Sequence, residues 1–466
     1  MANGKLPSYL ASATPNPVTN RAPWYKTTAQ TYAGIMLWFV FWDNFPIGAG
    51  LEKGLAVGLL SLIAAALVCH FLFYLVPGML GMQTGLPLYI VGTSTYGAKG
   101  GFLMPGVLMG LLQFGWLAVN GYFTGELLVS PFIENAKGSM PHMVVASGWI
   151  ILGAFVGVKG IQYVARVATF LPLIPLAILV ILFAMTAGGI GNFDTQALVK
   201  AGEEAVPPLT TFGILALIGT YVVGFFATAG AAGTDIASSN RNAKDVHLGG
   251  LVGIALATVF AAGVAMLIVA GAYGSKMVEA GGAMKPTALM EAIMGSKQTA
   301  GIFMYLLAIA AFPAACFSSL IAANSFKATM PKVRPLYSCG LGAIIAIVLA
   351  VTGWVGKAIM VFTVIGASFG PVCGAMMADY LLAGRKWPGP RAGFNLAGWI
   401  SWVVGFAVGA VEFIAMIPGL EGLAGKVPCP PVAAFIVGFV LYLILAKVGL
   451  QSRTLQMPAA EAPQGA

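Results

Sequence analysis

The feature that most constrains the fold is a succession of long apolar runs separated by short polar connections. A helix that crosses the hydrocarbon core of a bilayer needs roughly 20 apolar residues, and about twelve segments satisfy that rule. The runs do not alternate between polar and apolar residues, which excludes the strands of a membrane barrel. We therefore predict an all-α integral membrane protein. The expected helices lie at residues 30–50, 54–80, 102–130, 142–158, 161–187, 208–231, 247–273, 299–323, 337–355, 357–383, 395–416 and 429–448.

Composition supports a membrane environment for most of the chain. Charged residues make up only 8% of the sequence, against roughly 25% in soluble domains. The longest connection, residues 188–208, suits a loop and leaves no room for a soluble domain. The first 26 residues are polar and lack an apolar core, so we expect no cleavable signal peptide. We expect the short polar tail at the other end to be disordered.

The distribution of Lys and Arg predicts the orientation in the membrane. With alternating helices, 16 of these residues fall on the side of the N-terminus and 8 on the other side. Positive residues concentrate on the cytoplasmic side of membrane proteins, so we expect both termini to lie in the cytoplasm. The expected location is the plasma membrane or inner membrane, which the chain would cross several times. The lipid bilayer is then the expected surrounding, and no basic stripe indicates a nucleic-acid partner.

The third predicted helix carries three polar or amphipathic side chains on one face. Gln113, Trp116 and Asn120 are spaced i, i+3, i+7. Amide groups beside a flat indole suit a planar heterocycle, which would stack on the indole and bond the amides with its edges. Hydrogen bonds between packed helices explain the same residues about equally well.

The sixth predicted helix is rich in glycine. Gly224, Gly230 and Gly233 each weaken a helix by up to about 1 kcal/mol relative to Ala. Close packing of helices needs such residues without any ligand. A discontinuous helix with freed backbone groups at a binding site is the functional alternative. Asp235 follows near the expected cytoplasmic end, where we interpret it as a capping or ion-pairing residue.

Hydroxyl groups appear in the eighth predicted helix. Ser318 and Ser319 are neighbours in an apolar stretch, with Ala315 before them and Asn324 after them. Two hydroxyls and nearby carbonyls suit a small hard cation such as Na⁺. Serines in membrane helices also bond the carbonyl four residues earlier, so the pattern alone is weak.

One acid lies in the first predicted helix, within the sequence WFVFWDNFP. Asp43 falls about 16 residues after Thr27, near the outer end of that helix at roughly 1.5 Å per residue. We interpret it as an acid in a water-filled outer vestibule, with Trp38 closer to the depth of a substrate. Proton coupling is the alternative, because acids in membrane segments are often functional.

Three stretches together resemble a known family. They are residues 84–86 (TGL) with 94–100 (STYGAKG) and 113–116 (QFGW); the glycine-rich sixth helix ending in Thr234-Asp235; and residues 362–374 (FTVIGASFGPVCG) with 378–380 (ADY). This pattern resembles the nucleobase–cation symporter-1 family of cytosine/purine, allantoin and hydantoin permeases, and within it the bacterial cytosine permeases most.

The resemblance implies a particular transporter fold. Helices one to five and six to ten would form inverted repeats, helices one and six would be broken at mid-membrane, and two further helices would follow. The chain then divides into a polar tail (1–26), the repeat core (27–383), helices eleven and twelve (395–448) and a second cytoplasmic tail (449–466).

The resemblance also implies residue roles. Trp116 and Phe226 would sandwich the substrate, while Gln113, Asn120 and Asn324 would bond its edges, and backbone groups at Phe225 would add contacts. A sodium site would combine two kinds of ligand: carbonyls of Ala33, Met36 and Ala315, and hydroxyls of Ser318 and Ser319.

The implied function is secondary active import of a nucleobase or related planar nitrogen heterocycle, driven by Na⁺ with no other cofactor. We expect a functional monomer. A proton-coupled transporter that uses Asp43, for another heterocycle such as a vitamin precursor, stays an alternative. An enzyme would need a nucleophile–base pair or a metal cluster in the helices, and the sequence offers neither.

Overall fold

The computed structural model describes residues 6–159, 168, 170–198, 209–281, 285–330 and 332–457. Over these residues the chain is helical, with only two isolated β-bridges. Nine helical stretches of the described chain are long and apolar enough to cross a membrane, and α19 (Pro335–Val351) and α21 (Leu396–Gly409) are shorter apolar helices. The nine are Leu55–Thr84, Phe102–Val129, Met140–Lys159, Leu173–Asn192, Thr211–Ala231, Ala243–Gly274, Lys297–Phe326, Ala358–Leu382 and Pro430–Lys447.

Each of the twelve predicted segments contains helix, so the all-α membrane fold is confirmed. Several spans combine shorter elements: α5 and α6 join through a π-helical stretch at Cys69–Tyr74, and α15 and α16 join through Leu251–Leu256. The division into inverted repeats stays a prediction. The principal labels are α5 (Leu55–Val68), α6 (Leu75–Thr84), α9 (Leu108–Val129), α10 (Met140–Lys159), α12 (Leu173–Thr186), α13 (Thr211–Ala231), α15 (Ala243–Gly250), α16 (Ala257–Gly274), α18 (Lys297–Thr329), α20 (Ala358–Leu382) and α23 (Pro430–Lys447).

Helix one is broken, as the resemblance implied. It consists of α2 (Thr28–Met36), α3 (Phe39–Asp43) and α4 (Ile47–Leu51). Trp38 lies in the first break with extended backbone angles (φ −63°, ψ 125°). The hydroxyl of Tyr221 on α13 donates to the carbonyls of Val40 and Phe41, so helix six supports the short α3. The break therefore places Trp38 on non-helical backbone in the interior.

Helix six is interrupted later than its first glycine. The long α13 ends at Ala231, and α14 (Gly233–Ala237) continues the chain after Ala232. Gly224 lies inside α13, where an added Cβ would stand only 2.6 Å from the carbonyl oxygen of Phe362 on α20. Gly224 therefore permits close helix packing, and Gly233 marks the interruption.

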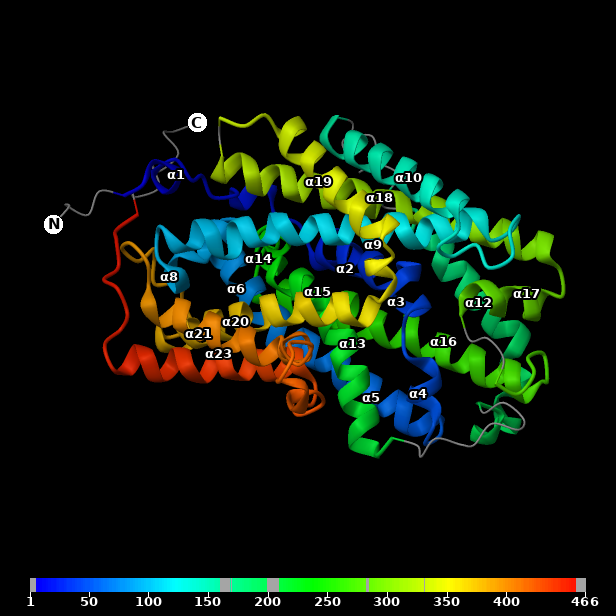
Figure 1. Ribbon diagram of the computed structural model, residues 1–466. Coiled ribbons are helices and arrows are strands. Elements are labelled where there is room, and N and C mark those ends of the chain that lie inside the picture. Colours follow the sequence, from blue (N-terminus) through cyan, green and yellow to red (C-terminus); the bar gives the residue numbers. More distant parts are fainter. Residues whose placement is uncertain are drawn as a thin grey trace.

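Two groups of helices surround the interior (Figure 1). α9 packs against α18, α10 and α19, while α20 packs against α23, α13 and α21. The first described residues and the last ones lie at the same end of the helices. This placement agrees with an even number of crossings.

Both polar tails lie against the helix ends. In the N-terminal tail, Arg21 Nη1 donates to Met82 O at 2.7 Å and Asn16 Nδ2 donates to Ser238 O at 3.2 Å. In the C-terminal tail, Leu455 N donates to Pro390 O at 2.6 Å. Disorder of the second tail was therefore a wrong prediction as far as Met457, because its backbone pairs with the loop before α21.

Candidate functional site

A cluster of aromatic rings fills the interior beside the break in helix one. Trp116 on α9 stacks on Phe362 of α20, with ring centroids 5.6 Å apart and planes 27° apart. Phe225 of α13 meets the Trp116 ring edge-on at 5.1 Å, and Trp38 approaches it at 6.0 Å. Rings from helices one, three, six and ten therefore converge on one indole.

A hydrogen bond fixes the Trp116 indole. Its Nε1 donates to the Thr228 hydroxyl of α13 at 3.1 Å, and both side chains are buried. The bond leaves the faces of the ring for stacking. Phe362 occupies one of those faces in this structure.

Two of the predicted amide ligands share this region with Trp116. Asn120 Nδ2 donates to Ala311 O of α18 at 3.0 Å, and its Oδ1 accepts from Trp149 Nε1 of α10 at 2.9 Å. Within the described residues, the hydrogen-bond partner of Gln113 Nε2 is the sulfur of Met109 at 3.5 Å, and sulfur is a weak acceptor. Asn120 thus connects three helices, while Gln113 is the less engaged of the two amides.

Helix six contributes a different ring from the one predicted. The Phe226 ring lies 5.7 Å from Tyr32 of α2, whereas Phe225 lies against Trp116 and Phe362. In an α-helix neighbouring residues point about 100° apart, so the two cannot share one face. Phe225 also lies well inside α13, where backbone N–H and C=O groups bond within the helix. The group that Phe225 offers to the cluster is therefore its ring and not its backbone.

Asn324 is not brought to the cluster. It is exposed on α18, and it follows Ala311 by about 20 Å of helix at 1.5 Å per residue. Its neighbours Ser325 and Phe326 lie against Gly110, near the start of α9. The predicted role of Asn324 came from a loose match in helix eight. The continuous helix α18 places Asn324 far along the chain from the aromatic cluster.

The predicted sodium ligands lie on two elements, the end of α2 and the middle of α18. Ala33 and Met36 end α2. A Cβ added at Gly153 of α10 would meet Ala315 of α18, and a Cβ added at Gly157 would meet Ser319 of α18. Ala315 and Ser319 thus face α10, and Ser318 is buried beside them. The buried hydroxyl of Ser319 has no hydrogen-bond partner among the described residues.

A small cavity of about 20 Å³ adjoins the break in helix one, enough for one water molecule. Its lining side chains carry no polar group apart from the indole of Trp38. On α18 the cavity meets Leu307, Ala310 and Ala311, roughly two turns before the serine pair. The remaining lining residues are Gly34, Leu37, Trp38, Phe39, Pro172 and Pro175.

Asp43 ends α3 and is half-buried. Asn44 Nδ2 donates to its Oδ2 at 3.2 Å. Its charge interacts with those of Glu126, Lys285 and Lys137. Lys137 in turn lies 3.9 Å from Glu126. Asp43 therefore belongs to a mixed cluster of charges at the end of the helices, as a vestibule acid would.

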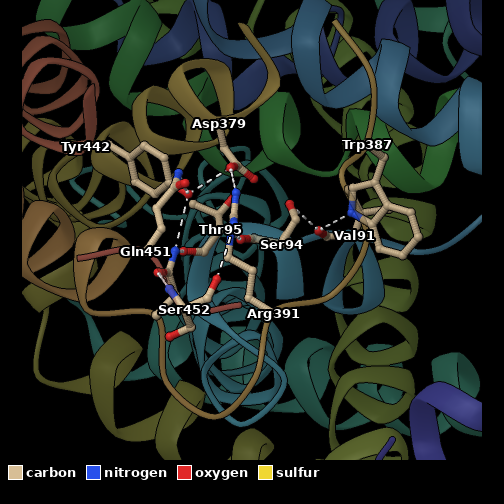
Figure 2. Close-up of polar contacts among 10 residues, drawn as sticks. Val91, Ser94, Thr95, Asp379, Trp387, Arg391, Tyr442, Gln451 and Ser452 are labelled. Carbon is tan, nitrogen blue, oxygen red and sulfur yellow. Dashed lines mark hydrogen bonds and ion pairs between the residues drawn. The ribbon is translucent and has the colours of Figure 1, made fainter. Parts of the chain in front are cut away.

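Helix ten is anchored at the end opposite Phe362 (Figure 2). Arg391 Nη2 donates to Asp379 Oδ1 at 2.9 Å, and the Tyr442 hydroxyl donates to the same oxygen at 2.8 Å. Arg391 also donates to the carbonyls of Ser94 and Ser452. The network joins α20, α23, the short helix α8 (Thr93–Tyr96) before helix three, and the C-terminal tail.

The partners of Asp379 were missed from the sequence. A carboxylate at the end of an apolar helix signals a need for a cationic partner. Three candidates follow it in the next loop, Arg385, Lys386 and Arg391, and spacing alone does not choose among them. The structure selects Arg391, which is buried.

Comparison with known proteins connects this architecture to transport. The cytosine permease of Escherichia coli O157:H7 is 24% identical over 395 residues, which cover 83% of this chain and 82% of the permease. The searched protein-family models include no match.

Solved structures share the fold. Mhp1, a nucleobase-cation-symport-1 family transporter in a closed conformation with bromovinylhydantoin bound, aligns with a TM-score of 0.63 at 17% identity, covering 95% of this chain and 97% of Mhp1. Its inward-facing conformation gives the same TM-score at 16% identity, covering 95% and 96%. A substrate-bound Na⁺-coupled sialic acid symporter aligns at 0.55 and 15% identity, covering 96% and 93%.

These relatives are permeases and symporters rather than enzymes, and the likeness extends over nearly the whole chain. The motifs around Trp116 and Asp379 occur within the shared fold. The chain is therefore an integral membrane secondary transporter that is similar to cytosine permeases over most of its length and shares the fold of a nucleobase-cation-symport-1 family transporter.

Proposed function

We propose that this transporter imports a nucleobase or a closely related small planar nitrogen heterocycle together with Na⁺. The observation that carries the proposal is the convergence of rings from helices one, three, six and ten on the Trp116 indole. Flat aromatic ligands gain stacking and apolar burial in such a place. The amide of Gln113, one turn before Trp116, would bond an edge of the ligand.

In this proposal the substrate takes the place of Phe362 on the face of Trp116. Phe362 lies toward the beginning of α20, whereas the far end of that helix is fixed through Asp379. Gly366 and Gly370 lie between the two and are candidate hinges. Movement of the first half of α20 would open the stacking face and then close over the substrate.

Sodium coupling is proposed from the family and from the hydroxyls of helix eight. The ligands would be carbonyls at the end of α2 (Ala33, Met36) and the Ala315, Ser318 and Ser319 set of α18. If both ligands favour the same state, each tightens the other's binding by the same factor. No resident cofactor is invoked.

Proton coupling through Asp43 is the second candidate, with a different heterocycle such as a vitamin precursor as the substrate. The observation that supports proton coupling is the half-buried carboxylate of Asp43 on the broken helix one. Uptake measured against pH, with and without Na⁺, separates the two mechanisms.

The orientation with both termini in the cytoplasm is also proposed, on the charge distribution. A monomer surrounded by lipid is the simplest unit for a site built within one chain. Labelling a single cysteine introduced at Ser12 from either side of the membrane tests the orientation.

The test of the function is a thermal-shift screen of the purified protein. Nucleobases, hydantoins and vitamin precursors are each added with and without Na⁺. A ligand present at 100 times its dissociation constant stabilises the native state by about 2.7 kcal/mol. We expect a shift with at least one heterocycle, larger in Na⁺ than in choline.

The matched variants are Trp116→Ala and Trp116→Phe. The first should abolish both the shift and uptake into proteoliposomes while the protein stays folded in the membrane. The second keeps a stacking surface and should retain part of each. Normal affinity in Trp116→Ala would show that the site lies elsewhere.

A further inference from the structure

The break in helix one carries a buried hydrogen-bond donor beside the aromatic cluster. Trp38 lies between α2 and α3 on extended backbone, and its ring is 6.0 Å from Trp116 and 6.3 Å from Phe225. It is buried. A side chain on non-helical backbone at this depth is held by its ring neighbours rather than by a helix face.

The indole nitrogen of Trp38 has no hydrogen-bond partner within the described part of the chain. A buried donor left unpaired costs about 1–3 kcal/mol. The adjoining cavity offers no acceptor side chain, because Gly34, Leu37 and the other lining residues are apolar. The protein around Trp38 therefore provides apolar contact without an acceptor side chain for its N–H.

Neighbouring polar groups differ from Trp38 in this respect. The Trp116 N–H is bonded to Thr228, and both ends of the Asn120 amide are bonded to protein. The Gln113 amide donates to a sulfur. Among these groups around the stacking face, Trp38 is the donor without any partner.

Trp42 provides an instructive contrast. Its indole nitrogen is also buried without a partner in the described chain. However, it lines a separate small cavity with Ile47, Pro286 and Leu289, away from the Trp116 cluster. Of these two unpaired indole N–H groups, the one that lies beside the stacking face of Trp116 is that of Trp38.

We propose that Trp38 Nε1 donates a hydrogen bond to an acceptor on the edge of the transported heterocycle. The inference rests on the proposed function and narrows its substrate class. The substrate then carries a carbonyl oxygen at the edge that faces helix one. A flat ring with a C–H in place of that oxygen would stack on Trp116 and place no acceptor at that position opposite the Trp38 N–H.

The test compares ligands that differ by one oxygen. The probes are cytosine with 4-aminopyrimidine, and hypoxanthine with unsubstituted purine, each bound to purified wild-type protein, Trp38→Phe and Trp42→Phe. The phenylalanine variants keep an aromatic ring and remove the N–H. Gel filtration and the melting temperature without ligand confirm that each variant is folded.

We expect Trp38→Phe to weaken binding of the oxo member of the better-binding pair about 5- to 30-fold, while its partner changes less than 2-fold. Trp42→Phe should leave both unchanged. An equal loss for both members, or no loss, overturns the role of Trp38 and leaves the proposed function standing. If no probe binds the wild-type protein with or without Na⁺, both the narrower inference and the heterocycle proposal fail.

Discussion

The Asp379 carboxylate and the Arg391 guanidinium lie 2.9 Å apart, with only 1% and 8% of the two residues exposed. Burial disfavours the charged guanidinium, but the Asp379 carboxylate outweighs it and raises the pKa of Arg391 above its usual range. Removal of one partner leaves a buried charge, which typically costs about 3–5 kcal/mol. We therefore expect Arg391→Ala to lower the melting temperature strongly, as measured on purified protein in detergent.

The double variant Asp379→Leu with Arg391→Met is the control for that prediction. Replacing a buried ion pair by apolar residues is often near neutral, so the double variant should lose less than the sum of the two single losses. Tyr442 and the Ser94 carbonyl lose partners in it, so some loss remains. Simple addition of the two losses would mean that the pair is not coupled.

A second prediction concerns the contact between helix six and helix ten. A Cβ added at Gly224 would lie 2.6 Å from the Phe362 carbonyl oxygen, so Gly224→Ala must push α13 from α20. Overpacking of this kind costs about 1–3 kcal/mol. We expect lower stability and slower uptake, because the displaced backbone carries the ring that stacks on Trp116.

Gly115→Ala is the matched control in α9. No atom lies within 4 Å of a Cβ built at Gly115, and Ala favours a helix over Gly by up to about 1 kcal/mol. Its melting temperature should stay the same or rise. Equal destabilisation by both substitutions would contradict the close-packing role of Gly224.

The sequence was sufficient for the membrane helices and for the helix-three face, because both depend on local spacing. It placed Gln113, Trp116 and Asn120 on one face, where the structure has them. It assigned the helix-six ring to Phe226 and only backbone groups to Phe225, and it grouped Asn324 with them, whereas the structure brings the Phe225 ring to Trp116 and leaves Asn324 exposed on α18. These assignments depend on the rotation and register of distant helices. One residue of rotation turns a ring by about 100°.

A third prediction separates two roles of Asn120. Its amide bonds both the Ala311 carbonyl and the Trp149 indole, so Asn120→Ala should lower the melting temperature without ligand. Leaving the Trp149 N–H unpaired contributes about 1–3 kcal/mol. Trp149→Phe alone should cost less, and the double variant should show coupling between the two residues.

The ligand-induced shift then decides whether Asn120 also contacts substrate. A purely structural residue would lower the melting temperature with and without ligand by the same amount. A substrate ligand would also reduce the shift itself. We expect the first pattern to dominate, since both polar atoms of the amide already have protein partners.

The last prediction concerns Asp43 and the coupling ion. Its carboxylate lies among the charges of Glu126, Lys285 and Lys137 at the end of α3, and it accepts a bond from Asn44. An acid with cationic neighbours can serve as part of an outer vestibule without releasing a proton in each cycle. We expect Asp43→Asn to keep Na⁺-driven uptake into proteoliposomes, with a pH profile unchanged between pH 5 and 8. Lys285→Gln should likewise leave the pH profile intact, because Lys285 belongs to the same cluster of charges as Asp43. If Asp43→Asn instead removes the pH dependence and uptake no longer responds to a proton gradient, Asp43 is the proton carrier and the Na⁺ proposal is wrong.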